Sequence, residues 1–139
     1  MSLWEPLDLV NVIVTGSIES DDYRNKLNLP RLSESLLNSE YYPKSFAALK
    51  LCRVAPFAKA LVFRSGKMVV VGSISIEQAN DNLRYFEKQI QSVAGSSYVV
   101  NEVTVQNMVA SSRLKNPETK INLLAFVKSL KRWSQFEPE

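Results

Sequence analysis

The 139-residue sequence contains no histidine and a single cysteine, Cys52. Histidine is the side chain most often used for acid–base catalysis, and histidine and cysteine together supply most zinc ligands. Only four glycines are present, and they form no glycine-rich phosphate loop. We therefore expect no enzymatic activity, no metal ion and no cofactor. Because a lone cysteine forms no internal disulfide, a reducing compartment is favoured.

Long hydrophobic runs are also missing. No apolar stretch reaches the roughly 20 residues that cross a bilayer, and the N-terminus lacks the pattern of a secretory signal. The composition, 45% apolar and 22% charged, is ordinary for a soluble globular chain. The length suits one compact domain, or one domain and part of another, and we expect no membrane partner.

Acidic residues are absent from residues 41–76, whereas they collect upstream between Glu19 and Glu40. The acid-free stretch carries six cations: Lys44, Lys50, Arg53, Lys59, Arg64 and Lys67. A one-sided basic stretch on predicted strands is typical of a polyanion-binding face. A solvated face with scattered lysines explains the same charges, so charge alone does not decide between the two.

Apolar periodicity predicts the secondary structure. Strands are expected at about 9–18, 45–54, 59–64, 67–75 and 103–111. Pro56 and Gly66 separate the three middle strands by tight turns, which indicates an antiparallel meander. A polar loop is expected at 19–26.

Helical periodicity predicts three helices, at about 29–39, 76–93 and 119–133. The middle helix has the clearest pattern, with an apolar stripe that consists of Ala79, Leu83, Phe86, Ile90 and Val93. Ser75 precedes it as the expected N-cap.

Two similar strand sequences occur in the chain, at Asn11–Ser17 and at Asn107–Arg113. In both copies an asparagine is followed two places later by an apolar residue, and two places after that by a hydroxyl. Such self-similarity indicates a duplicated unit. The sequence thus divides into an extension at 1–8, a complete unit at 9–95 and a partial second unit at 96–139, which lacks its meander and last helix.

Several segments together resemble the core domain of the TATA-binding protein family. The matching words are LVNVIVT, NSEYYPKSFAALKL, ALVFRSGKMVVVGS and VQNMVASSRL, in that order. The resemblance implies an α+β fold with a curved antiparallel sheet and helices on its convex face. One full strand–helix–three strands–helix repeat would be followed by the strand–helix start of a second.

The resemblance implies a general transcription factor that binds A·T-rich DNA in the minor groove and bends it by phenylalanine insertion. This family is itself the usual example of that binding mode. The positions that match its DNA contacts are Asn11, Ile13, Thr15, Phe46, Leu61, Phe63, Ser65, Lys67, Val69, Val71, Asn107 and Val109. In the family the paired asparagines donate to base edges, the two phenylalanines insert between base steps, and Ser65 and Lys67 fall where the chain touches phosphate.

The resemblance also implies protein partners. Glu137 and Glu139 match the acidic segment that meets transcription factor IIB, and Glu40 and Tyr41 lie near the site for factor IIA. Arg84 and Lys88 would lie on a convex surface for regulators. The implied location is the nucleus, or the cytoplasm for an archaeal or viral protein.

The sequence departs from the family's pattern at several positions. Ser45 and Cys52 stand where family members commonly carry arginine, and Val71 replaces a threonine. The missing second meander leaves half a saddle, which a homodimer would complete. A shortened piece of a two-repeat protein explains the same omission. A second function therefore stays open, in which the fold is a protein-interaction module that binds transcription factors or regulators with weak or no DNA binding.

Overall fold

The computed structural model describes residues 3–22, 24 and 26–116. The chain divides into two compact units, one formed by Asp8–Ser111 and the other by residues 1–7 and 112–139. In the smaller unit, Trp4 forms an antiparallel bridge with Leu114. The predicted helix at 119–133 lies outside the described residues. The sequence also predicts a boundary between two repeats after residue 95. The division into compact units does not test that boundary, which stays a prediction.

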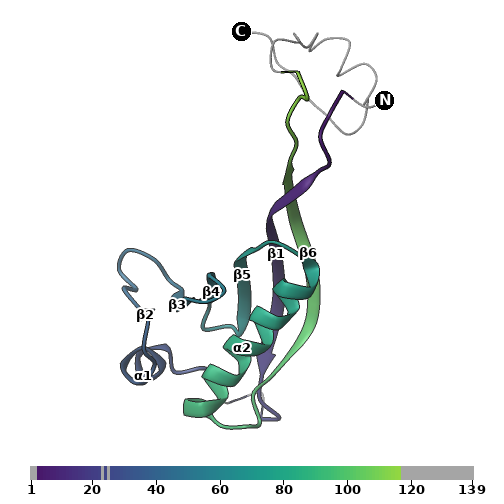
Figure 1. The fold of residues 1–139 in the computed structure, drawn as a ribbon. Helices are drawn as coiled ribbons and strands as arrows, with labels where there is room; N and C mark the ends of the chain where they lie inside the picture. Colours follow the sequence, from purple (N-terminus) through teal and green to yellow (C-terminus); the bar gives the residue numbers. More distant parts are fainter. Residues whose placement is uncertain (1–2, 23, 25, 117–139) are drawn as a thin grey trace, which may run out of the picture. The chain divides into compact units, whose positions relative to one another are not determined.

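The larger unit is an open antiparallel sheet of six strands in the order β2-β3-β4-β5-β1-β6 (Figure 1). The strands are β1 (Asp8–Glu19), β2 (Ser39–Glu40), β3 (Leu49–Arg53), β4 (Ala58–Val62), β5 (Lys67–Ser73) and β6 (Val99–Ser111). The meander is confirmed, because β3, β4 and β5 pair in sequence as antiparallel neighbours. The α+β fold class predicted from the sequence is confirmed as well.

The core lies between one face of the sheet and helix α2 (Ile76–Ala94). Ser75 caps the helix, since its Oγ accepts from the Gln78 N–H at 3.0 Å. The predicted stripe is buried at Ala79, Leu83, Phe86 and Ile90, and Val93 packs against its margin. Full burial of each large apolar side chain contributes about 1.5–3 kcal/mol, so this stripe is the main attachment of the helix to the sheet.

Helix α1 (Leu29–Ser35) is shorter than the predicted helix at 29–39. Leu36 is already extended, and the Ser39 hydroxyl donates to the Leu36 carbonyl at 2.7 Å. Asn38 has a φ of 57°, which a helix cannot contain. The chain therefore leaves the helix early to form the two-residue strand β2, an element that the sequence did not predict.

The predicted strand at 45–54 also begins later, at Leu49. Ser45 and Phe46 both donate their N–H groups to the Tyr42 carbonyl, at 3.0 Å and 2.9 Å, which makes a turn of this segment. Phe46 therefore lies on a turn and not within a strand.

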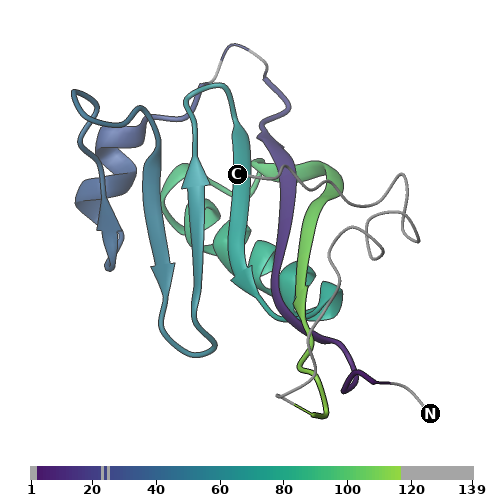
Figure 2. The ribbon, with the colours of Figure 1, turned by 90° about the horizontal axis from the view of Figure 1, so that it is seen from above.

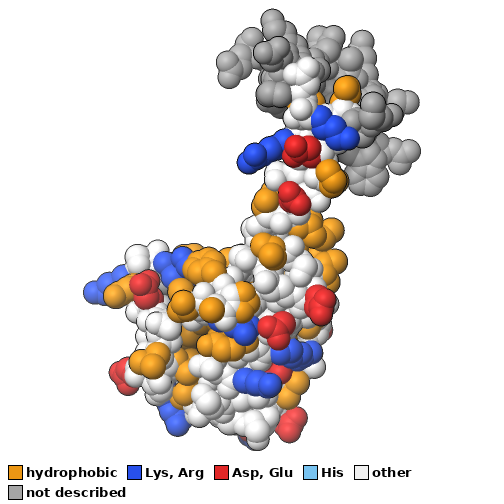
Figure 3. Space-filling view, viewed as in Figure 1, with side chains coloured by type: hydrophobic (Ala, Val, Ile, Leu, Met, Phe, Trp, Pro, Cys, Tyr) orange, Lys and Arg blue, Asp and Glu red, His pale blue; other side chains and the backbone are white. Residues whose placement is uncertain are grey.

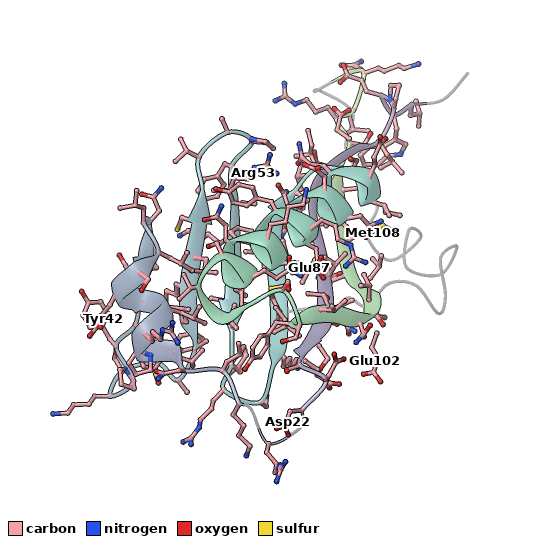
Figure 4. The ribbon with its side chains drawn as sticks, turned by 90° about the horizontal axis from the view of Figure 1, so that it is seen from below. Asp22, Tyr42, Arg53, Glu87, Glu102 and Met108 are labelled. Atoms are coloured by element: carbon pink, nitrogen blue, oxygen red, sulfur yellow. The ribbon has the colours of Figure 1, made fainter. Side chains whose placement is uncertain are left out.

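Strand β6 is fixed to α2 by a buried carboxylate. Glu87 Oε2 accepts from the Val100 N–H at 2.6 Å and from Arg84 Nη1 at 2.8 Å. Figure 4 shows Glu87 on the side of the sheet that α2 covers. Beyond Val100 the residues of β6 are exposed, and the strand pairs with β1 along its full length, from Asp8–Ser111 to Glu19–Val99. The β1–β6 ribbon consequently extends past the other strands (Figure 1).

Gly66, in the turn between β4 and β5, provides a stability test. Its φ is +95°, and a Cβ there would lie 2.5 Å from the Ile18 carbonyl oxygen, which is backbone and cannot turn away. We expect Gly66→Ala to lower the free energy of unfolding by about 2–4 kcal/mol, combining backbone strain with the clash. Urea unfolding followed by circular dichroism measures the loss.

Gly95→Ala is the matched control, because Gly95 also has a positive φ, of +115°, but no atom within 4 Å of the added Cβ. It should lose only the strain, about 1–2 kcal/mol. Equal losses in the two variants would contradict the close approach of Gly66 to β1.

Candidate nucleic-acid interface

Helix α2 covers one face of the sheet and lies behind the strands in Figure 2, and no helix of the described residues covers the opposite face. We call it the open face. Strand β1 alternates from Asn11 to Ile18, with Val12, Val14, Gly16 and Ile18 buried toward α2 and the residues between them half-buried on the open face. This alternation places Asn11, Ile13 and Thr15 there, as period two requires.

The register carries the open face across neighbouring strands. Leu61 on β4 is opposite Val69 on β5, Val69 is opposite Thr15 on β1, and Thr15 is opposite Thr104 on β6. Directly opposed residues share a face of the sheet, so these four side chains form one row. Val71 joins the same face two residues from Val69. The predicted apolar contacts therefore lie together on one largely apolar surface.

The two copies of the repeated strand pair with each other about a local two-fold axis. Val12 is opposite Met108, Asn11 is opposite Val109, and Ile13 is opposite Asn107. The equivalent residues exchange places across the Val12–Met108 pair, since Asn107 corresponds to Asn11 and Val109 to Ile13. The two asparagines consequently flank the centre of the β1–β6 pair, and the centre itself, at Met108, projects on the α2 side (Figure 4).

Asn11 is held with its amino group free. Its Oδ1 accepts from the Gly72 N–H at 3.0 Å. A bulge makes this N–H available, because Val71 and Gly72 together oppose Ile13 and Gly72 has a φ of +94°. A backbone N–H pairs only with an acceptor, which fixes the amide orientation. Within the part of the chain that the structure describes, no partner takes the Nδ2 group, so it is oriented to donate to a ligand.

Phe46 and Phe63 come together at the end of β4. Their ring centroids are 6.3 Å apart with an interplanar angle of 64°, an edge-to-face arrangement. Phe46 is 40% exposed and Phe63 is half-buried. Two adjacent aromatic rings at a surface present an apolar wedge to a partner.

Ser65 lies in the turn that follows this pair and Lys67 is the first residue of β5, and both are exposed. The Phe63 N–H donates to the Lys67 carbonyl, and the Gly66 N–H donates to the Phe63 carbonyl, each at 2.9 Å. The turn thus presents a hydroxyl and an ammonium group beside the aromatic rings.

Arg53 does not belong to the basic face that the charge pattern predicts. Alternation along β3 places its side chain on the same face as buried Leu49 and Leu51. Its Nη1 donates to Asp81 Oδ2 at 2.9 Å and to Asn82 Oδ1 at 3.0 Å. Its guanidinium also stacks over Tyr85, 4.3 Å from the ring centroid (Figure 4). Buried Asn82 in turn donates to Ser73 Oγ at 2.9 Å. Arg53 therefore joins β3 and α2 on the covered side.

The residues expected to bind proteins lie on other surfaces. Glu40 is exposed on the edge strand β2, while neighbouring Tyr41 is half-buried against the core. Arg84 and Lys88 are exposed on α2, and Arg84 is engaged with Glu87 at 2.8 Å. Glu137 and Glu139 lie outside the described residues.

Sequence reasoning missed three polar residues of the open face. Gln106 Nε2 donates to Thr15 Oγ1 at 3.0 Å and so orients that hydroxyl. Gln106 is the extra residue where the β1–β6 register shifts, which sequence periodicity does not reveal. Lys50 and Lys59 were noted for their charge alone, although Lys59 stands two residues before Leu61 in the alternating pattern.

The described residues contain no group of three His, Cys, Asp or Glu side chains placed to hold a metal ion. Their helices include none with the length and apolarity needed to cross a membrane.

A family model described as transcription factor TFIID, or TATA-binding protein, matches residues 7–93, more than half of the chain. The chain is 36% identical over 126 residues to the TATA-box-binding protein of Archaeoglobus fulgidus, covering 91% of this chain and 68% of the relative. It is 34% identical over 131 residues to that of Tetrahymena thermophila, covering 94% of this chain and 50% of the relative.

Among solved structures, Methanococcus jannaschii TBP superposes with a TM-score of 0.60 at 29% identity, covering 76% of this chain and 58% of that chain. The chain thus spans between half and about two thirds of the length of these proteins. The sequence motifs, the topology of the sheet and these matches agree, and the chain belongs to the TATA-binding protein family of transcription factors.

Proposed function

We propose that this chain binds A·T-rich duplex DNA through the open face and bends it. The observation that carries the proposal is the arrangement of Asn11 and Asn107 about the Val12–Met108 pair, with an apolar row beside them and the Phe46–Phe63 wedge at the end of β4.

The chemistry of this face suits the minor groove. At A·T pairs the groove offers only acceptors, adenine N3 and thymine O2, whereas G·C pairs add a donor, guanine N2. The Asn11 Nδ2 group, with its Oδ1 already paired to Gly72, supplies a donor and no competing acceptor. The leucine and valine side chains of this face offer no acceptor, so burying a guanine amino group against them costs a hydrogen bond. The face therefore favours A·T pairs.

The wedge accounts for bending. Insertion of Phe46 and Phe63 between base steps costs a few kcal/mol of unstacking and lets the opened groove lie on more of the sheet. The TATA-binding protein family is the standard instance of this mechanism, so the mechanism comes to this chain from its family.

We further propose that the chain recruits general transcription factors. Glu40 and Tyr41 would serve factor IIA, Glu137 and Glu139 factor IIB, and the exposed Lys88 on α2 a regulator, with equivalents in a non-eukaryotic host. Exposure of Glu40 and Lys88 supports this assignment. Arg84 contributes less, since its guanidinium is engaged with Glu87. We expect the protein where its DNA is, in a nucleus or in an archaeal or viral host's cytoplasm.

We propose that the chain forms a homodimer through the edge of the sheet at β6. Among the described strands β6 is an edge of the sheet, and Val103, Val105, Met108 and Val109 on it are 39–51% exposed. Figure 3 shows hydrophobic side chains at the surface along the β1–β6 ribbon. A free edge with exposed apolar residues and one charge, Glu102, is suited to strand pairing with a second copy.

The interaction-module function remains the second candidate. Ser45 and Cys52 favour it, because each supplies no charge where arginine is common in the family. It predicts factor binding without a preference for A·T-rich DNA.

Binding to an A·T-rich and a G·C-rich duplex, by fluorescence anisotropy at two or more salt concentrations, separates the two candidates. We expect tighter binding to the A·T-rich duplex and a log–log salt slope of about −3.6 if four phosphates are contacted. A steep slope with no sequence preference would leave only nonspecific attraction, and no binding to either duplex would favour the interaction module.

Phe63→Ala should reduce bending more than it reduces initial association, because the encounter is electrostatic and the kink needs the ring. Energy transfer between dyes at the duplex ends measures bending, and stopped-flow anisotropy measures association. Leu37→Ala, which removes a side chain 91% exposed away from the open face, is the control. Unchanged bending in Phe63→Ala would rule out the wedge.

Sedimentation equilibrium at micromolar concentration tests the dimer. We expect the unmodified chain to sediment as a dimer and Val103→Lys to sediment as a monomer, because a lysine on an edge strand opposes strand pairing. Leu37→Lys adds the same charge at an exposed site elsewhere and should leave the dimer intact. A monomer at every concentration would refute the dimer.

A further inference from the structure

Two lysines stand on the strands of the open face itself. Lys50 on β3 is opposite Leu61 on β4, and Lys59 on β4 is opposite Cys52 on β3. Since opposed residues share a face, both lysines lie beside the apolar row that contains Leu61. Lys67, the first residue of β5, also shares this face by its alternation with Val69 and Val71. Lys44 and Arg64 lie in turns, and Arg53 lies on the covered side.

Each of these lysines lies over a phenylalanine ring. Lys50 Nζ is 5.4 Å from the centroid of Phe46, and Lys59 Nζ is 5.8 Å from the centroid of Phe57. Phe57 immediately precedes β4 and is 57% exposed. A cation within about 6 Å of a ring face is attracted to it, by about 0.5–1 kcal/mol at exposed sites. Both ammonium groups are therefore held near the sheet surface.

Neither lysine forms an ion pair within the part of the chain that the structure describes. The ion pairs of the described residues involve Arg24, Arg53 and Arg84, and no acidic residue occurs in residues 41–76. Glu40 on β2 is the cross-strand neighbour of Lys50 and shares its face, and the described residues show no ion pair between the two. Lys59 is opposite the uncharged Cys52. Both ammonium groups therefore remain available to a ligand.

Both lysines also adjoin the positions that lack arginine. Lys59 is the cross-strand partner of Cys52, and directly opposed side chains start about 4.5–5.5 Å apart. Lys50 lies over Phe46, the residue that follows Ser45. The positive charge missing at Cys52 is thus present on its cross-strand neighbour, and Lys50 supplies a charge near the turn that contains Ser45.

We propose that Lys50 and Lys59 bind backbone phosphates of the duplex that the open face receives, with Phe46 and Phe57 as the residues that position them. The inference rests on the proposed function, and it adds two binding residues and one positioning residue, Phe57. An ammonium group is a compact donor without base preference, so these contacts strengthen binding without selecting sequence. In the open face, asparagines and apolar side chains at the centre would then contact the bases, while the lysines on β3 and β4 would contact phosphates.

The test compares Lys50→Gln, Lys59→Gln and the double variant with the unmodified full chain on A·T-rich and G·C-rich duplexes between 50 and 200 mM salt. We expect each substitution to make the log–log salt slope shallower by about 0.9 and the double variant by about 1.8. The ratio of A·T-rich to G·C-rich affinity should stay unchanged. Lys26→Gln, at an exposed lysine before α1 with no assigned role, should leave the slope unaltered.

Two further variants test the chemistry of the contact. Lys59→Arg should retain the slope, because it keeps the charge. Phe57→Leu should weaken binding with the slope retained, because the lysine stays but is less confined. Unaltered slopes in both glutamine variants, with the unmodified chain still preferring A·T-rich DNA, would overturn this inference alone. Absence of binding by the unmodified chain would overturn the proposed function together with it.

Discussion

The packing of α2 against one face of the sheet determines the rest of the structure. Its stripe of Ala79, Leu83, Phe86 and Ile90 covers the buried residues of β1, β4 and β5. Because strand side chains alternate, every residue drawn toward α2 directs its neighbours to the opposite side. The open face exists because the core is one-sided. A polar anchor, Glu87 with the Val100 N–H, extends the same attachment to the start of β6.

The β1–β6 pair turns a duplicated sequence into a symmetric surface. Once Val12 and Met108 are opposed, Asn11 and Asn107 fall at equivalent positions on either side of them. A duplex has a local two-fold axis of its own, so a symmetric pair of donors suits its two strands equally. The symmetry ends at β6 among the described residues, where β6 is an edge of the sheet.

The sequence predicted this fold wherever local pattern and tertiary packing agree. The alternation of β1, the stripe of α2, the Ser75 cap and the Gly66 turn all lie where expected, because each depends on near neighbours. The early end of α1 depends on the Ser39 hydroxyl, and the late start of β3 depends on the Tyr42 turn, so neither is visible as periodicity. The predicted contact residues on the strands share one face, whereas Phe46 and Ser65 lie in turns, and the roles of all of them remain predictions. The prediction for Arg53 was wrong because it used the run of positive charges and ignored the alternation of side chains along the strand. Its spacing from Leu49 and Leu51 already assigns it to the covered side.

Chemical-shift mapping by nuclear magnetic resonance tests most directly the claim that the open face receives the duplex. A labelled sample of the full chain would be titrated with an A·T-rich duplex, and the side-chain amide signals of Asn11 and Asn107 followed beside the backbone signals of α2. We expect large shifts for both asparagines and for the β4–β5 turn, with the exposed residues of α2 nearly unchanged. Shifts concentrated on α2, with the two asparagine amides unmoved, would contradict the account.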